Sequence, residues 1–194
     1  MMKTNSSQKL NRLLKPGVVY RREMLAHYST AVDRDLATLV ENDMLEKLAA
    51  GLYYRPLMSR FGPLPPKDSA LVKAFLKDEN FLLVSWTEYN SLGLGLTQLY
   101  NRFTVYNHKR HGLFQLGDKT FDCRRPAYGF PKKLTPAFLL VDLFNHLGEL
   151  DEDVDKLKNK TKKLPADLLK QAQLLAKKYG KVATKKFFSE LNQT

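Results

Sequence analysis

Apolar positions in the N-terminal part of the chain change their period several times, and each change predicts a short element. Leu10, Leu13 and Leu14 have helical spacing, and Pro16-Gly17 interrupts that segment. The run at 18–20, two β-branched valines and a tyrosine, is too short for a helix and predicts a small strand. The chain therefore opens with a helix followed by a strand.

Two more helices and a hairpin are expected next. A short helix over 21–27 precedes Ser29 and Thr30, either of which could cap a longer helix. The apolar positions of that longer helix, spaced by three and four, are Val32, Leu36, Leu39 and Val40. Residues 45–55 alternate around Gly51, which is typical of a tight hairpin. This order predicts a winged helix-turn-helix over residues 1–56, a domain that offers one helix to a DNA major groove.

The side chains left outside this expected core suit DNA. Arg34 and Thr38 are four residues apart and share one stripe of the helix, and arginine can bond guanine bidentately. The expected contacts, including phosphate donors from the preceding helix, are Tyr20, Arg21, Arg22, Thr30, Ala31, Arg34, Thr38, Lys47 and Arg55. A second interpretation pairs Arg34 with Asp33, Asp35 or Glu41 on the same helix, which would then be a solvated face.

A proline-rich segment at 57–67 predicts a linker, because neither a helix nor a central strand passes through it. Beyond it, residues 68–194 predict a second domain. Its expected elements are helices at 68–77 and 86–92, strands at 81–84, 102–107, 112–116 and 119–125, and helices at 138–147, 151–164, from 165, and at 182–191. Thr135, followed by Pro136, is the expected cap of the first late helix. The predicted class is α+β: a winged helix, then a small mixed α/β domain with a helical C-terminal portion.

Net charge and cysteine content narrow the expected partners and the expected compartment of the protein. The 194-residue chain has a net charge of +12 and a pI near 9.7, which favours a polyanionic or acidic partner. The excess is spread along the chain, so it supports nucleic acid only weakly. Cys123 is the single cysteine, which excludes an internal disulfide and fits a reducing compartment. Residues 1–11 lack the apolar stretch of a secretory signal, and no apolar run is long enough to span a membrane. We therefore expect a cytoplasmic protein.

Patterns typical of catalysis are weak. His108 and His111, with Asp122 and Cys123 further on, do not make a closed zinc set, and no metal or cofactor is expected. Cys123 lies in a strand pattern and fits a structural thiol. The glycines of 93–97 lack the lysine that follows in phosphate-binding loops. The sequence does not indicate an enzyme.

Basic and aromatic residues alternate in the second domain. The set comprises Arg102, Lys109, Arg110, His111, Arg124 and Arg125 with Tyr100, Phe103 and Tyr106. Three interpretations are open: stacking and neutralisation of single-stranded nucleic acid, docking on an acidic protein, or a solvated basic face over a half-buried sheet. For docking, the expected contacts are Arg102, Lys109, Arg110, Arg124 and Arg125.

Two blocks carry a family resemblance. Residues 32–40 (VDRDLATLV) and 44–54 (MLEKLAAGLYY) resemble the winged helix of AbiEi-type antitoxins of abortive-infection (type IV) toxin–antitoxin systems. Residues 90–99 (NSLGLGLTQL) and the following strands are similar to the next region of that family, so the likeness covers roughly 8–130. It implies a regulator that binds inverted repeats at its own promoter and opposes a nucleotidyltransferase-like toxin. The alternative is a protein- or RNA-binding module with a structural winged helix.

Overall fold

The computed structural model describes residues 6–96 and 102–191 and has the expected α+β class. The chain divides into two compact units. The first is Met1–Glu79 with Phe114–Thr120, and the second is Asn80–Leu113 with Phe121–Thr194.

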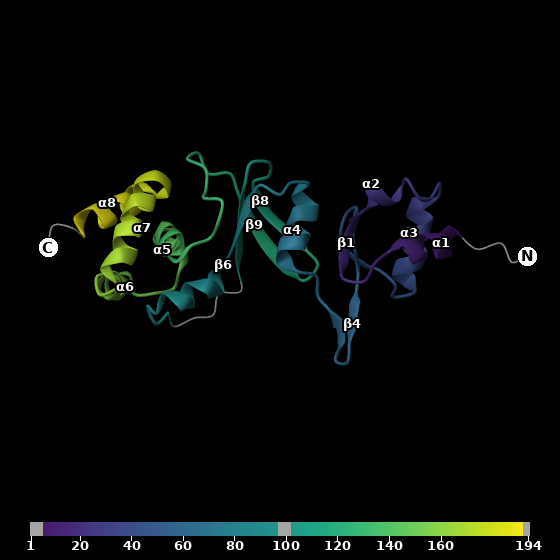
Figure 1. Ribbon diagram of the computed structural model, residues 1–194, viewed down its shortest axis with the longest axis horizontal. Helices are drawn as coiled ribbons and strands as arrows, with labels where there is room; N and C mark the ends of the chain where they lie inside the picture. The colour runs from purple at the N-terminus through teal and green to yellow at the C-terminus, as the bar shows by residue number, and fades with distance from the viewer. Residues whose placement is uncertain (1–5, 97–101, 192–194) are drawn as a thin grey trace, which may run out of the picture. The chain divides into compact units, whose positions relative to one another are not determined.

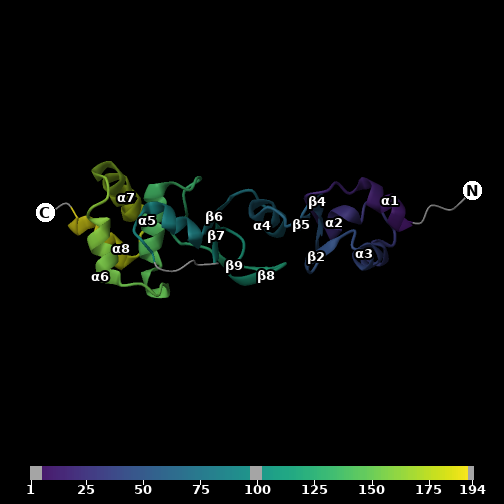
Figure 2. The ribbon, with the colours of Figure 1, turned by 90° about the horizontal axis from the view of Figure 1, so that it is seen from below.

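The first unit begins with helices and a small antiparallel sheet. Its elements are α1 (Ser6–Leu13), β1 (Val18–Arg21), α2 (Arg22–Leu25), α3 (Val32–Glu41), β2 (Glu46–Ala49) and β3 (Leu52–Arg55). The strand order is β1-β3-β2, and Gly51 turns between β2 and β3 with a φ of 69°. Helices α1 and α3 pack together on one side of the sheet (Figures 1 and 2). The element order expected for the first 56 residues is thus present.

An apolar cluster joins these helices. Leu10 of α1 and Leu36 of α3 are completely buried, and Leu14 and Leu45 pack with them. Leu13 is 51% exposed, because the side of the chain that faces the core carries Leu10 of α1 and Leu14 just after it. The three-and-four spacing of α3 therefore predicted its buried face correctly at Val32, Leu36 and Leu39.

The expected linker at 57–67 is largely a hairpin. Strands β4 (Leu57–Ser59) and β5 (Gly62–Leu64) pair with each other, and Pro63 lies opposite Met58. A two-stranded ribbon tolerates proline because each strand has one unpaired edge. The hydroxyl of Tyr54 donates to the Leu64 carbonyl at 2.8 Å and fastens the ribbon to β3.

Helix α4 (Asp68–Leu76) also belongs to the first unit, rather than starting the second. It packs against β1, and Lys77 after it pairs with Glu23 at 2.5 Å. The turn between strands β8 and β9 is grouped with this unit as well. There Gly117 donates its N–H to the Leu48 carbonyl at 2.7 Å, and Lys119 pairs with Asp68 at 2.6 Å.

The second unit is built on a mixed sheet. Its strands are β6 (Phe81–Ser85), β7 (Phe103–Asn107), β8 (Gly112–Leu116) and β9 (Lys119–Arg124), and the 3-10 helix η1 (Trp86–Leu92) follows β6. The order is β6-β7-β9-β8, with β7 antiparallel to β6 and parallel to β9. As a central strand, β7 is buried at all five positions.

Helices gather on one side of this sheet (Figures 1 and 2). They are α5 (Pro136–Asn145), η2 (Leu147–Glu149), α6 (Val154–Thr161), α7 (Ala166–Tyr179) and α8 (Val182–Glu190). Helix α5 is the central one, buried from Ala137 to Phe144. Thr135 caps it as expected, accepting the N–H of Phe138 at 3.2 Å. Across the part of the chain that is described, no helix combines the length and apolar character needed to cross a membrane.

Candidate nucleic-acid interface

Helix α3 carries three carboxylates, and the first of them is engaged by α2. The Arg22 guanidinium donates to Asp33 through Nε at 2.6 Å and through Nη2 at 2.5 Å. The hydrogen bond from Arg22 lowers the pKa of Asp33, and the same bond raises the pKa of Arg22. Arg22 was expected to be a phosphate donor, but its guanidinium already holds a carboxylate.

The second carboxylate, Asp35, points into the fold. It is only 2% exposed, and its Oδ2 accepts the hydroxyls of Ser6 and Ser29, each at 2.5 Å. The Ser29 oxygen also accepts the N–H of Ala31 at 3.0 Å. The N-cap of α3 is Ala31, without a side-chain bond, so the prediction of a Ser29 or Thr30 cap was wrong: Ser29 is committed to the turn and to Asp35.

Arg34 is then the exposed charge in the first half of α3 that has no ion-pair partner among the described residues. Glu41, the third carboxylate, lies seven residues away, about 10 Å along the axis at 1.5 Å per residue. The half-buried Thr38 donates its hydroxyl to the Arg34 carbonyl at 3.0 Å. The interpretation in which Arg34 pairs with a carboxylate of the same helix is therefore wrong for the described residues.

The other residues expected to contact DNA divide into exposed and engaged side chains. Thr30 and Lys47 are exposed, and Ala31 is half-buried at the start of α3. Arg55 donates from Nη1 to the Met44 carbonyl at 2.7 Å, so it closes the turn after α3. The hydroxyl of Tyr20 accepts the N–H of Lys15 at 2.7 Å.

Arg21 is a special case among these residues. Its side chain is 18% exposed and lies 3.9 Å from Glu23 through Nη2. Its Nε and Nη1 are buried and have no hydrogen-bond partner in the described part of the chain. Arg21 is therefore a half-buried residue of β1 rather than a free phosphate donor at a helix start.

In the second unit, Arg124 lies inside an ionic network. Its guanidinium donates to Asp122 from Nη2 at 2.6 Å, to Glu149 at 3.0 Å, and contacts Nε2 of His146 at 2.5 Å. Burial lowers the pKa of Arg124, but its hydrogen bonds to Asp122 and Glu149 raise it more. This engagement leaves Arg124 little capacity for the partner contact that was expected.

The network continues to a buried carboxylate on α5. Asp142 is fully buried and accepts the hydroxyls of Tyr89, at 2.7 Å, and Tyr106. Burial and the nearby Asp142 charge raise the pKa of both tyrosines well above the usual value. His146 donates from Nδ1 to the Asp142 carbonyl at 2.8 Å, which leaves its Nε2 to accept from Arg124. The arrangement is a satisfied polar core that the sequence pattern did not reveal.

The expected basic and aromatic face is not assembled. Phe103 and Tyr106 are buried, and Tyr100 lies outside the described residues. Arg102 covers the Trp86 ring at 4.2 Å and lies 3.4 Å from Glu149. The exposed members of the expected set are Arg102, Lys109, Arg110, His111 and Arg125.

The structure also shows the surroundings of the residues considered for metal binding and nucleophilic chemistry. His108 stacks on Phe130 with ring centroids 4.8 Å apart. Within residues 6–96 and 102–191, no group of three His, Cys, Asp or Glu side chains is arranged to hold a metal. Cys123 is buried, and burial raises the pKa of its thiol to about 11, so the thiolate is scarce at neutral pH.

Comparisons with known proteins give one structural similarity. No protein-family profile matches the chain, and no curated protein sequence matches it. Among solved structures, the Rv2827c protein from Mycobacterium tuberculosis is similar at a TM-score of 0.46 and 18% identity. The match covers 97% of this chain and 80% of that one. A similarity at this level does not identify a function.

Proposed function

We propose that residues 1–56 form a winged helix that binds duplex DNA through α3, and that the protein is a transcriptional regulator. One observation carries the proposal. Asp33 and Asp35 are both held by partners within the first unit, and Arg34 is left as the free charge on the first half of α3.

The position of Arg34 suits base recognition. It lies in the first turn of α3, near the positive end of the helix dipole, and in helix-turn-helix proteins the N-terminal part of the recognition helix meets the base edges. An unpaired guanidinium there can reach the O6 and N7 atoms of guanine. Thr30 and Lys47 supply exposed donors on the preceding turn and on the β2–β3 hairpin. Arg22 then acts as a positioning residue, because it removes the Asp33 charge from beside Arg34.

The test is an electrophoretic shift with the DNA upstream of the protein's own gene. Arg34→Ala should cost about 1–3 kcal/mol at the specific site and relax the base preference there. Arg60→Ala, which removes another exposed arginine of the first unit, is the matched control and should bind like the unmodified protein. The absence of a salt-sensitive complex would contradict the proposal.

We also propose, from the resemblance of residues 32–54 and 90–99, that the protein is the antitoxin of a toxin–antitoxin pair. The second unit has its own apolar core around α5. Its folding, and therefore any partner-binding surface that it carries, does not depend on the Arg34 side chain of α3. Full-length protein with Arg34→Ala should lose promoter repression yet still relieve growth arrest by a nucleotidyltransferase-like toxin from the adjacent gene. Relief that disappears together with repression would mean that the two activities are not separable.

A further inference from the structure

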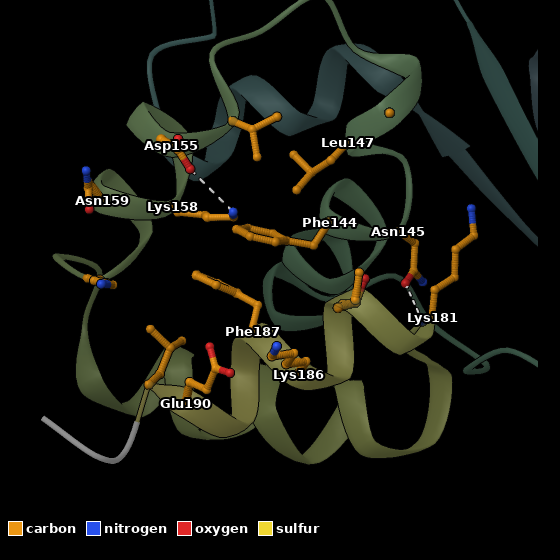
Figure 3. Close-up of a pocket in the computed structure, with 16 residues that line it drawn as sticks. Phe144, Asn145, Leu147, Asp155, Lys158, Asn159, Lys181, Lys186, Phe187 and Glu190 are labelled. Carbon is orange, nitrogen blue, oxygen red and sulfur yellow. Dashed lines mark hydrogen bonds and ion pairs between the residues drawn. The ribbon is translucent and has the colours of Figure 1, made fainter.

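A large cleft opens in the second unit between α6 and α8. Its volume is about 890 Å³, and its walls come from the end of α5, from α6 and from α8 (Figure 3). None of the expected DNA contacts or strand-face residues lines it. The cleft is therefore a separate surface from the expected DNA-binding and strand-face residues.

The floor of the cleft is apolar. Phe144 and Phe187 stack in the middle of it, with ring centroids 4.4 Å apart and planes 13° apart (Figure 3). Leu147, Val154 and Leu191 extend the apolar lining. Such a floor favours an occupant with apolar side chains, because both sides then remove apolar surface from water.

The rim of the cleft is basic. It carries Lys158 of α6 and the C-cap residue Lys162 after it, together with the N-cap residue Lys181 before α8 and Lys186 in the middle of that helix. Lys158 lies 3.4 Å from Asp155, whereas the other three form no ion pair with any described residue. Asp155 and Glu190 are the carboxylates in the lining, so its net charge is positive.

The spacing of the lysines indicates an extended occupant. Along the helix axes, the C-cap residue Lys162 follows Lys158 of α6 by about 6 Å, and Lys186 follows the N-cap residue Lys181 of α8 by about 7.5 Å. The two pairs come from the two sides of the cleft, and a single small anion cannot neutralise all four lysines. A chain with several carboxylates can.

The aromatic pair argues against nucleic acid as that occupant. Base stacking needs a free ring face. Phe144 is 4% exposed and is covered by Phe187, which also packs edge-on against Phe188 at 5.2 Å. Phe144 therefore offers no free ring face on which a base could stack.

We propose that this cleft binds an acidic amphipathic segment of a partner protein. Apolar side chains of the segment pack on Phe187, Leu147 and Leu191, and its carboxylates pair with Lys162, Lys181 and Lys186. Thr184 also lines the cleft, 2% exposed, with a hydroxyl that has no partner among the described residues, and a polar group of the segment would supply one. This recognition mode is that of a helix or peptide lying in a groove. The inference is independent of DNA binding by α3.

The experiment is a peptide selection on immobilised full-length protein. The displayed library has random segments of about 16 residues, roughly four helical turns. Selected peptides are synthesised and titrated by calorimetry. We expect them to be acidic, with apolar residues at three-and-four spacing. Lys162→Glu with Lys186→Glu should weaken their binding about tenfold or more.

Two further variants show whether binding depends on the cleft itself. Lys170→Glu with Lys177→Glu makes the same change of charge on exposed positions of α7 outside the cleft and should leave affinity within about twofold. Ala183→Trp places a bulky side chain at an exposed lining position and should abolish binding, with an unchanged thermal midpoint and unchanged DNA affinity. Three outcomes would overturn the proposal: no enriched peptide, enriched peptides without acidic residues, or binding unaffected by Ala183→Trp. Tighter binding of a single-stranded RNA oligonucleotide, lost in the same variants, would also overturn it.

Discussion

The Arg22–Asp33 pair of the first unit and the Arg124 network of the second use the same chemistry in different surroundings. The Arg22 and Asp33 side chains are 43% and 71% exposed, whereas those of Arg124 and Asp122 are 21% and 19% exposed. Water screens the first pair, so its main effect is on the local charge pattern. In the second, Arg124, Asp122 and Glu149 are largely withdrawn from water and bonded to one another, so the loss of Arg124 leaves partly buried groups with fewer partners.

The largest effect on the free energy of unfolding is therefore expected from a substitution of Arg124. Arg124→Ala would leave Asp122, Glu149 and His146 without their shared donor and should reduce the free energy of unfolding by about 3 kcal/mol. Urea denaturation measures this. Arg125→Ala, the exposed neighbour, is the control and should change stability by no more than about 0.5 kcal/mol. Equal effects of the two variants would show that the network is not the stabilising element.

A smaller effect on stability is expected from the protonation of His146. Burial, together with the Arg124 charge, lowers the pKa of His146 despite the nearby Asp142. The folded protein thus keeps a neutral imidazole at a pH where the unfolded chain, with a histidine pKa of about 6.5, binds a proton. Stability is then fully present above that pH and decreases as the pH falls below it, with a slope of at most about 1.4 kcal/mol per pH unit from this residue. Denaturation curves between pH 7.5 and 5.5 measure the slope, which His146→Asn should reduce. A slope unchanged in that variant would assign the dependence to other groups.

The smallest effect on stability is expected at the exposed pair. Arg22→Ala and Asp33→Ala should leave the urea midpoint almost unchanged, since both side chains return to water when unpaired. The same denaturation series checks this. A loss comparable to that of Arg124→Ala would erase the distinction between the two sites.

Local pattern predicted much of the fold. The three-and-four spacing gave α3, Gly51 gave the hairpin turn, and Thr135-Pro136 gave the start of α5. These features depend on residues close in sequence. They could therefore be found without knowledge of the tertiary structure.

The candidate site was less predictable because its contacts are long-range. Asp35 is on the polar side of α3 by pattern, yet it is buried by Ser6, twenty-nine positions earlier. Phe103 and Tyr106 were expected on an accessible strand face, but β7 lies between two strands and is covered on both faces. Arg124 meets Glu149 only through the fold. No local periodicity contains this information.

The role of Arg22 decides how α3 is prepared for DNA: Arg22 either holds Asp33 or contacts phosphate. Fluorescence anisotropy with one promoter duplex, over a range of salt concentrations, separates the two roles. Arg22→Ala alone should weaken binding, because it frees the Asp33 charge beside Arg34. Adding Asp33→Ala should restore affinity toward that of the unmodified protein. A double variant as weak as Arg22→Ala alone, with a reduced salt slope, would make Arg22 a phosphate donor and contradict the account.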